Sequence, residues 1–360
     1  MLRCRLTDAA HLDPSLRAAW TALTVGNPVL ASPYFAPEFT EAVASVTRTA
    51  RLLVVEEDGR IAALLPMQRR APGLYGPIGG PLNDIHGLIA PAGTTVDSAD
   101  LLANAGVGMM SLRHAPIGAA ALGARFGAPH AFHVMTLAGG YAAYEERRLP
   151  FAKSAFRAIR TRSEKARKDF GALTLVFDDR SDRTLETLIR WKQAQFAATR
   201  QPMLFDFSWV RELVDRLHTA HDPALRGQLS SLYFGDALVA AHFGLRTRET
   251  LHYWFPGYDP TYAELSPGNI LLRLMAESAA AEGVQALHLG AGEYRYKLEF
   301  SDCSFPVTDG VAFARSGAGH AAAAASQALA HLTKALPKKL LPLPGRALRR
   351  LDWHLAFRAA

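Results

Sequence analysis

The sequence of 360 residues contains little cysteine and no long run of apolar residues. Its two cysteines, Cys4 and Cys303, stand near opposite ends of the chain and cannot by themselves form a disulfide framework or a cysteine-rich zinc site. No apolar run approaches the roughly 20 residues that a membrane-spanning helix needs. The first residues also lack the continuous apolar stretch of a secretory signal. We therefore expect a cytoplasmic protein.

The sequence also lacks the short motifs of several enzyme classes. It contains no His-Glu-x-x-His, no Cys-x-x-Cys, no Walker loop and no Gly-x-Ser-x-Gly. Its thirteen histidines are scattered and do not show the spacing of metal ligands. The glycines at 290–292 do not complete a dinucleotide-binding fingerprint. These absences count against redox chemistry and metal-dependent hydrolysis, and we expect no metal and no resident cofactor.

The formal charge of +7 is unevenly distributed. Residues 147–168 hold nine Lys or Arg and one acid, a local +8, and residues 334–360 hold seven against one, a local +6. The rest of the chain therefore carries −7, which argues against a nucleic-acid fold with a wholly basic face, and we expect no DNA partner. The basic segments are either solvated helix faces or contacts for anionic lipid, nucleotides or tRNA.

The chain consists of two similar halves. In each half two helical patterns precede a strand hairpin, which turns at Asp58-Gly59 in the first half and at Gly235-Asp236 in the second. The helical patterns cover residues 14–23 and 37–46, then 183–200 and 208–218. This repetition predicts the duplication of one α/β unit.

We expect three segments from these patterns. An N-terminal lobe covers residues 1–145, and a C-terminal lobe covers 146–312 and begins with a basic linker. Residues 313–360 form an alanine-rich helix followed by a basic amphipathic tail. Only about residues 345–357 of the tail can form a continuous helix, which is too short to span a membrane but suits peripheral attachment to an anionic leaflet. The alternative is a tail that packs on the protein body.

The second half continues with a strand, a helix and another strand. The strand covers residues 251–256, after which Ser266 supplies a helix N-cap and Pro267 the first helical position. Gly283 ends the helix, and residues 285–290 form the next strand. The N–H groups and the dipole at such a helix start favour a phosphate or an oxyanion.

Ordered motifs in both halves resemble the GNAT-type acyltransferases of the CelD cellulose and exopolysaccharide family, which are relatives of the FemAB aminoacyl transferases. The resemblance covers roughly residues 15–310. In the second half it rests on His242-Phe243-Gly244, Tyr253-Trp254-Phe255, Tyr258-Asp259-Pro260, Ser266-Pro267-Gly268, Gly290-Ala291-Gly292 and Tyr296-Lys297. In the first half it rests on Ser32-Pro33-Tyr34-Phe35, on Leu65-Pro66 and on residues 76–89, GPIGGPLNDIHGLI.

This resemblance implies an α/β (α+β) fold with tandem GNAT-like, FemAB-like lobes, each a mixed or antiparallel sheet flanked by helices. It also implies acyl-CoA as the co-substrate, although two features depart from the family pattern. His288 stands where the family often has Asp. The glycine-rich acetyl-CoA signature of ordinary GNAT enzymes is absent, and only Ser266-Pro267-Gly268 occupies its place.

Acyl transfer from a thioester to an amine needs a base, a polarised carbonyl and a proton for the leaving sulfur. His242 is the candidate base, because an imidazole accepts a proton near neutral pH. Tyr253 is the candidate acid, Lys297 the candidate partner of the oxyanion, and Asp259 a further catalytic candidate. The remaining candidates are Ser266, Gly268 and Asn269 for acyl-CoA, Asn83, Asp84, His86 and Tyr296 for the acceptor, and His288 in second rank.

Each candidate also has a structural interpretation. His242 would be a hydrogen-bonded core histidine, Tyr253 a packed ring and Asp259 the cap of a turn. Lys297 would form a surface ion pair with Glu293 or Glu299. The segment 83–86 would form an Asx-turn with an exposed imidazole, and His288 would lie in a strand core.

The predicted activity is N-acyl transfer, with acetyl as the first acyl group considered, to an amino group of a sugar precursor for exopolysaccharide or envelope synthesis. One alternative is a long-chain acyl donor with a lipid amine acceptor of the sphingolipid type. Another is a regulatory protein on a degenerate scaffold. In that case Arg346 and Arg350, spaced as Arg-x-x-x-Arg, would bind a cyclic dinucleotide.

Overall fold

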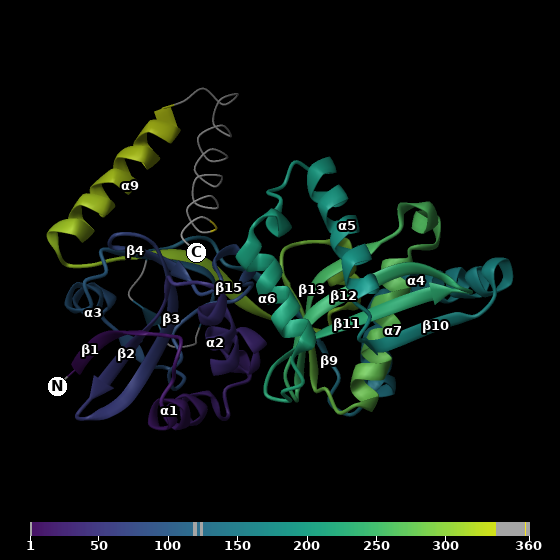
Figure 1. The fold of residues 1–360 in the computed structure, drawn as a ribbon, viewed down its shortest axis with the longest axis horizontal. Helices are drawn as coiled ribbons and strands as arrows, with labels where there is room; N and C mark the ends of the chain where they lie inside the picture. The colour runs from purple at the N-terminus through teal and green to yellow at the C-terminus, as the bar shows by residue number, and fades with distance from the viewer. Residues whose placement is uncertain (1, 118–120, 123–124, 336–356, 358–360) are drawn as a thin grey trace. The chain divides into compact units, whose positions relative to one another are not determined.

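The computed structural model describes residues 2–117, 121–122, 125–335 and 357 and divides into two compact units (Figure 1). Unit 1 comprises residues 1–130 and 306–360, and unit 2 comprises residues 131–305. We had expected boundaries after residues 145 and 312. The division differs because strand β9 (His130–Thr136) pairs within unit 2 and strand β15 (Cys303–Phe313) pairs within unit 1. Each unit thus contains a strand that sequence order assigns to the other half.

Unit 1 contains a mixed sheet in the order β1-β2-β3-β4-β6-β15. Its pairs are antiparallel, except that β4 and β6 are parallel. The strands are β1 (Leu2–Asp8), β2 (Ala50–Glu57), β3 (Arg60–Ala71), β4 (Leu74–Pro77), β6 (Met109–Pro116) and β15, with the short β5 (Thr95–Val96), β7 (Ala121–Leu122) and β8 (Arg125–Phe126). The helices are α1 (Pro14–Thr24), α2 (Pro37–Val46), α3 (Ser98–Asn104), α9 (Gly317–Ala335) and the 3₁₀ turns η1 (Pro28–Ala31), η2 (Pro33–Phe35) and η3 (Gly80–Leu82).

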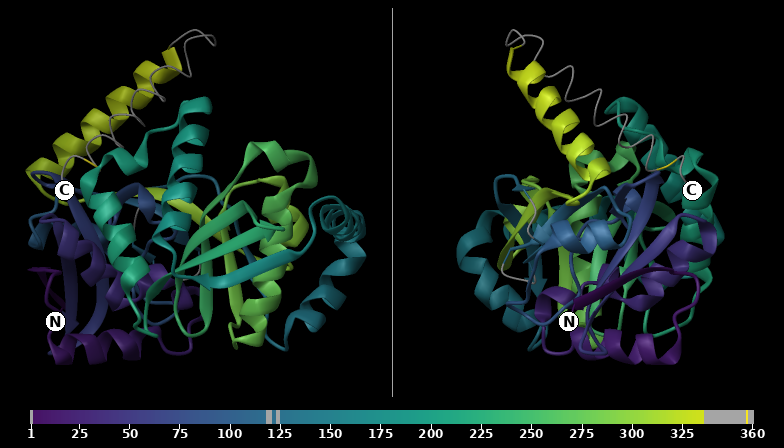
Figure 2. Two further views of the ribbon diagram at one scale, coloured as in Figure 1. Left: turned by 45° about the vertical axis from the view of Figure 1, so that its right-hand side comes forward. Right: turned by 90° about the vertical axis from the view of Figure 1, so that its left-hand side faces the viewer.

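Unit 2 contains the sheet β9-β14-β13-β12-β11-β10, and Figure 2 shows its strands from two further sides. Here β13 and β14 form the parallel pair. The remaining strands are β10 (Leu173–Asp179), β11 (Arg226–Phe234), β12 (Ala237–Arg246), β13 (Thr250–Tyr258) and β14 (Ala286–Ala291). The helices are α4 (Tyr141–Phe170), α5 (Asp182–Ala198), α6 (Ser208–Thr219), α7 (Pro267–Ala281), α8 (Arg295–Phe300) and the 3₁₀ turns η4 (Leu204–Asp206) and η5 (Pro260–Leu265).

The two units repeat one order of elements. Two helices precede a β-hairpin, which turns at Gly59 in unit 1 and at Gly235 in unit 2, and both glycines have positive φ. A further antiparallel strand follows, and the chain then crosses over to a parallel strand. The expected α/β fold with two related lobes, each a mixed sheet flanked by helices, is confirmed.

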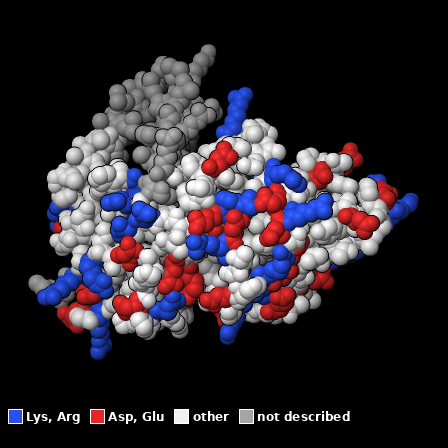
Figure 3. Space-filling view, viewed as in Figure 1, with Lys and Arg blue, Asp and Glu red and all other residues white. Residues whose placement is uncertain are grey.

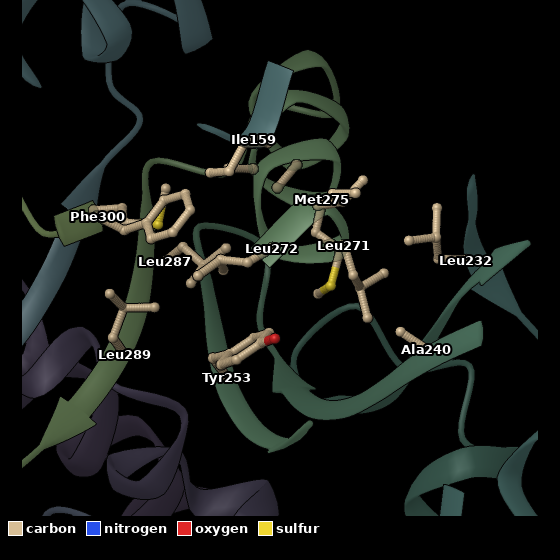
Figure 4. Packing of buried hydrophobic residues seen from close by; sticks show 14 of the residues in the cluster. Ile159, Leu232, Ala240, Tyr253, Leu271, Leu272, Met275, Leu287, Leu289 and Phe300 are labelled. Carbon is tan, nitrogen blue, oxygen red and sulfur yellow. The ribbon is translucent and has the colours of Figure 1, made fainter. Parts of the chain in front are cut away.

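Helices cover both faces of the sheet in unit 2. α5 and α6 pack on one face, and α4 and α7 pack on the other. On the face of the sheet that α7 covers lies a hydrophobic core that includes Leu271, Leu287 and Leu289 (Figure 4). Figure 4 also shows the ring of Tyr253 among these side chains. The core fixes β13 and β14, the strands that position the candidate site.

The basic segment of the linker lies within α4, a helix with an irregular turn at Ala152 just after Pro150. Its apolar residues recur at helical spacing and are buried, for example Phe156 and Ile159, whereas most of its Lys and Arg residues are exposed. This pattern fits a solvated helix face. On the face of unit 2 that Figure 3 displays, acidic residues lie among the basic ones.

Within the described residues, no helix is long and apolar enough to cross a membrane. The predictions for the tail, including Arg346, Arg350 and the membrane-attached helix of residues 345–357, fall on residues 336–360, which lie outside the described residues except for Phe357.

Candidate active site

The two parallel strands of unit 2 separate part-way along their length. β13 and β14 pair only from Thr250 opposite Ala286 to His252 opposite His288. Beyond this point β13 pairs with β12, and β14 pairs with β9. In the described chain the edge of β13 that faces β14 then has no further strand partner. Backbone N–H and C=O groups at such an edge are available to hydrogen-bond a ligand.

Helix α7 begins shortly after this edge. Ser266 has the left-handed conformation (φ 50°, ψ 56°), precedes Pro267 and makes no side-chain cap hydrogen bond. The N–H of Asn269 donates to the carbonyl oxygen of Ser266 at 3.0 Å. Since proline has no N–H, Gly268 supplies the remaining donor of this first turn. The three residues predicted for acyl-CoA thus stand at the positive end of a helix of 15 residues, a position that suits a phosphate group.

Polar side chains gather where β14 ends. Gly290 and Gly292 have φ values of 82° and 105°, a region that favours glycine, and they turn the chain toward α8. Gly290 lies opposite His133 of β9. Lys297 of α8 extends back, and its ammonium donates to the carbonyl oxygen of Ala291 at 2.6 Å. His133 and Lys297 are only 5% and 6% exposed. The end of the strand therefore holds two buried basic side chains.

His133 is a neutral base in this arrangement. Its Nδ1 lies 3.1 Å from the hydroxyl of Ser301, and its Nε2 has no hydrogen-bond partner among the described residues. Burial lowers the pKa of His133, the positive charge of Lys297 lowers it further, and Glu293 opposes both effects. A neutral imidazole can accept a proton from an amine.

The structural interpretation of Lys297, a surface ion pair with Glu299, does not match the structure, because Lys297 is buried. Glu299 instead accepts from Arg295 at 2.7 Å. The ammonium of Lys297 lies under the ring of Tyr294, 5.5 Å from the ring centroid. The contacts with Ala291 and Tyr294 fix a positive charge at the end of β14, where it can stabilise a developing oxyanion.

His242 and Tyr253 lie side by side in the core of unit 2. Their rings stack, with centroids 4.4 Å apart and planes 6° apart. The N–H of Trp254 donates to Nε2 of His242 at 3.2 Å. Burial lowers the pKa of His242 well below its ordinary value, and the nearby His252 adds to this shift. These contacts match the core interpretation of His242. The lone pair of Nε2, which a base would use to accept a proton, already accepts the N–H of Trp254.

Burial also raises the pKa of Tyr253 well above its usual range, and Tyr296 adds to this effect. The rings of the two tyrosines lie 6.1 Å apart. The hydroxyl of Tyr253 therefore stays protonated at neutral pH and remains suited to donate a proton. Tyr296, predicted to contact the acceptor, is half-buried against the same core.

Two other candidates have the contacts of structural residues. Asp259 accepts from the N–H of Thr261 at 2.9 Å and caps η5, which matches its structural interpretation. His288 is 3% exposed and contacts Phe132 edge to face at 5.5 Å. Because side chains alternate along a strand, His288 points away from the face that carries Leu287.

The segment 83–86 of unit 1 is held by internal hydrogen bonds. Asn83 donates to the carbonyl oxygen of Ile78 at 3.0 Å and accepts from the N–H of Ile85, which forms the expected Asx-turn. His86 is buried, not exposed, and its Nε2 donates to the carbonyl oxygen of Pro66 at 2.7 Å. Burial lowers the pKa of His86 to about 4. Only Asp84 of this segment keeps a partly exposed carboxylate.

Residues 153–298 match the family model of the acetyltransferase (GNAT) domain. This range contains the separated strands, α7 and Lys297. Over these residues the chain is similar to a GNAT-type acyltransferase domain. The expectation of an acyltransferase is therefore confirmed, and the match lies in the unit where the parallel strands separate. A comparison with curated proteins finds no match to the chain.

Solved structures resemble the chain over both units. FemX aligns with 9% identity and a TM-score of 0.54, over 84% of this chain and 96% of FemX. A conserved protein of unknown function from Bacteroides thetaiotaomicron aligns with 12% identity and a TM-score of 0.50, over 85% of this chain and 98% of that protein. A tandem GNAT protein from the clavulanic acid biosynthesis pathway aligns with 13% identity and a TM-score of 0.49, over 87% and 98%. The FemX alignment shows a FemX-like fold over the 84% of the chain that it covers.

The sequence patterns did not identify His133 or Ser301. His133 lies within residues 1–145, which the sequence patterns assign to the N-terminal lobe, and only the pairing of β9 with β14 brings it to the site. The single signal was a histidine between Phe132 and Val134, two buried apolar neighbours.

Proposed function

We propose that the chain transfers an acyl group, with acetyl as the first to test, from acyl-CoA to a primary amine. The observation that carries this proposal is the separation of β13 and β14. Ligands of α/β sheets bind beyond the carboxyl ends of the parallel strands. Here α7 offers its N-terminus after β13, and His133 and Lys297 lie at the end of β14. The N-terminus of α7 suits the phosphates of CoA, and the basic residues at the end of β14 suit the chemistry of acyl transfer.

In the proposed reaction, neutral His133 accepts a proton from the acceptor ammonium. The free amine then attacks the thioester carbonyl, so that a C–N bond forms and the C–S bond breaks. Lys297 stabilises the oxyanion that develops on the carbonyl oxygen. Tyr253 donates its proton to the leaving thiolate and takes up the second proton that the attacking nitrogen loses as the amide forms. The sequence analysis also predicted a histidine as the base, but it named His242. We prefer His133, because its Nε2 has no partner among the described residues, whereas Nε2 of His242 accepts from Trp254.

The acceptor that we propose is an amino group of a sugar precursor in exopolysaccharide or envelope synthesis. This choice rests on the ordered motifs that resemble the CelD family. The long-chain donor with a lipid amine is a second donor and acceptor pair for the same chemistry, and it belongs in the same test. The internal hydrogen bonds of Asn83 and His86 give them a structural role, so we do not assign the acceptor to that segment.

The test incubates the purified full-length chain with a mixed pool of short and long acyl-CoA and with a panel of amino sugars and lipid amines. Release of free thiol reports turnover, and the mass shift of the amine names both substrates. Lys297→Met should lower kcat by roughly 10²-fold or more, because it removes the charge opposite the oxyanion. His221→Ala, an exposed histidine of unit 2, should leave the rate unchanged.

An amine acylated by the wild-type chain, with a much slower Lys297→Met variant, supports the proposal. A wild-type rate for Lys297→Met would remove Lys297 from the mechanism. If the chain binds acyl-CoA or a nucleotide but releases no thiol with any acceptor of the panel, the transfer proposal is wrong and a binding protein is indicated.

A further inference from the structure

A second group of ligand-type side chains lies in unit 1 and shares no residue with the proposed reaction. His114, His130 and Asp309 each place one ligand atom within 4.8 Å of the others. The rings of the two histidines meet edge to face, with centroids 5.1 Å apart. They come from β6, from the first residue of β9 and from β15, and only the fold brings these segments together. Both histidines are partly buried, and Asp309 is exposed.

The hydrogen bonds of His114 determine which of its nitrogens can bind a ligand. Nδ1 lies 2.8 Å from the carbonyl oxygen of Asp84 and 3.2 Å from its carboxylate. A carbonyl oxygen only accepts, so Nδ1 carries the proton and Nε2 keeps its lone pair. Metal-binding histidines commonly donate their other N–H to a carbonyl or carboxylate in this way. The contact with Asp84 therefore prepares His114 to bind a metal through Nε2.

The backbone at His114 is specialised for this position. His114 has φ 45°, an uncommon value for a residue inside a strand, and the register of β6 against β15 shifts beside it. The N–H of His114 donates to Oδ1 of Asp309 at 2.9 Å. This bond leaves the other oxygen of Asp309 as a ligand and holds the carboxylate next to the imidazole. The bulge thus joins two of the three ligand residues directly.

We propose that His114, His130 and Asp309 bind one divalent transition-metal ion in unit 1, with Asp84 as the residue that positions His114. Two imidazoles and one carboxylate suit Zn²⁺, which takes four ligands, and water would complete the set. Mg²⁺ and Ca²⁺ prefer oxygen ligands and fit this set poorly. The ion would connect β6, β9 and β15. This proposal departs from the expectation of no metal that the scattered histidines gave.

The test uses the full-length chain, stripped with a chelator and titrated with ZnCl₂ against a chromophoric competitor. The wild type should bind one equivalent of Zn²⁺ tightly, and Co²⁺ in its place should give the visible absorption bands of a tetrahedral site. His130→Ala and Asp309→Asn should each weaken Zn²⁺ binding at least about 100-fold. Asp84→Asn should weaken it about 10-fold to 100-fold, the range for residues that orient a ligand.

His114→Asn is the variant of choice at position 114, because asparagine tolerates the left-handed backbone that alanine does not. Circular dichroism checks its fold. His221→Ala removes an exposed histidine of unit 2 and serves as the matched control, which should bind Zn²⁺ like the wild type. Zn²⁺ should also raise the unfolding temperature of the wild type but not that of His130→Ala, because the ion binds only the folded site.

Tight binding of one Zn²⁺ that His114→Asn and His130→Ala both abolish would establish the site. Weak binding of several ions, or equal binding by His130→Ala and the wild type, would show adventitious binding to surface histidines and would overturn the proposal. Neither result depends on whether acyl transfer is observed.

Discussion

The two units share one strand order but use the end of their parallel pair differently. In unit 2 a helix of 15 residues, α7, connects β13 to β14, and buried basic residues gather where β14 ends. In unit 1 the connection between β4 and β6 carries η3, the two-residue β5 and the seven-residue α3, and its segment 83–86 is closed by internal hydrogen bonds. Repeating a scaffold therefore does not repeat its site, because the connection after the parallel strand decides what can bind there.

The buried histidines of the two units give the sharpest comparison. His133 of unit 2 has a buried Nε2 without a partner among the described residues, and His86 of unit 1, which donates through Nε2 to Pro66, has a buried Nδ1 in the same state. The two rings differ in their surroundings, because His133 lies opposite the end of β14, near the charge of Lys297. We expect His133→Ala to lower kcat by roughly 10² to 10⁴, the usual contribution of a general base. His86→Gln should alter kcat by less than about threefold in the same thiol-release assay, because His86 is not among the residues that we propose for the reaction.

The pH profile separates a base from a packing residue. The wild-type rate should fall as the pH drops through the lowered pKa of His133, because the protonated imidazole cannot accept the proton of the amine. His133→Ala should lose this dependence, and His242→Ala should keep it. The reverse result would return the base role to His242, as the sequence first indicated.

The second prediction concerns the contribution of His86 in unit 1 to stability. His86 has a pKa of about 4 in the fold, against an ordinary value of 6.5. The unfolded chain therefore binds more protons between these values, so the contribution is complete above pH 6.5 and is lost as the pH falls toward 4. The difference corresponds to about 3 kcal/mol of unfolding free energy.

Denaturant unfolding of the wild type and of His86→Gln between pH 4 and 7 measures this effect. Glutamine can still donate an N–H to Pro66 but does not titrate, so the variant should lose the part of the pH dependence that His86 contributes and keep the part that His242 and His133 contribute. His11→Gln, an exposed histidine of the same unit, should keep it. Parallel pH curves for the wild type and His86→Gln would contradict the assignment to His86.

Local patterns predicted the elements of both units, whereas contacts between distant segments determined the rest. The helical periods at 37–46 and the turn at Gly235 depend on neighbours in sequence, and both appear in the structure. The placement of β9 in unit 2 and of β15 in unit 1 depends on pairing between strands more than a hundred residues apart. Local sequence patterns do not show which distant strands pair. His133 escaped prediction for that reason.

The same limit applies to the metal ligands. His114, His130 and Asp309 show no metal-binding spacing in sequence and meet only in the folded unit. Lys297 and Tyr253 became candidates because Lys297 follows a glycine-bearing strand end and Tyr253 belongs to the motif Tyr253-Trp254-Phe255, and the structure adds their contacts. Motifs thus located the candidate site along the chain, but the fold determined which side chains it contains.

The third prediction compares two tightly packed glycines. A Cβ at Gly244 of β12 would lie 2.2 Å from the carbonyl oxygen of His252, which is backbone and cannot move freely. A Cβ at Gly76 of β4 would lie equally close to the guanidinium of Arg70, whose flexible side chain can move. We expect Gly244→Ala to lower the free energy of unfolding by about 1 to 3 kcal/mol, the usual cost of overpacking. Gly76→Ala should cost less than about 1 kcal/mol, since the side chain of Arg70 relaxes.

Thermal and urea unfolding of the two variants test this difference. Gly244 also adjoins the register shift between β12 and β13, so its substitution should reduce acyl transfer through the displaced Tyr253. If Gly244→Ala and Gly76→Ala lower the free energy of unfolding equally, the rigid backbone beside Gly244 is no less tolerant of a Cβ than the flexible side chain of Arg70 beside Gly76, and the prediction is wrong.

The smallest expected effect concerns a surface feature that the two units share. Arg17 of α1 bonds Glu38 and Glu41 of α2, and Arg211 of α6 bonds Glu186 of α5 as well as Asp215. In both units one arginine therefore joins the two helices that precede the hairpin. Because these pairs are partly exposed, each should contribute only about 0.2 to 1 kcal/mol.

Arg17→Met and Arg211→Met retain the apolar stem and remove the charge. Since each arginine makes two such pairs, each substitution should lower the unfolding free energy by about 0.4 to 2 kcal/mol. Salt screens exposed charges, so the loss should shrink between 0.05 M and 1 M NaCl, where the Debye length falls to about 3 Å. Additive losses in the double variant are expected, because the two clusters share no partner. A loss of several kcal/mol that persists in high salt would show that the arginine stems, not their charges, hold the helices together.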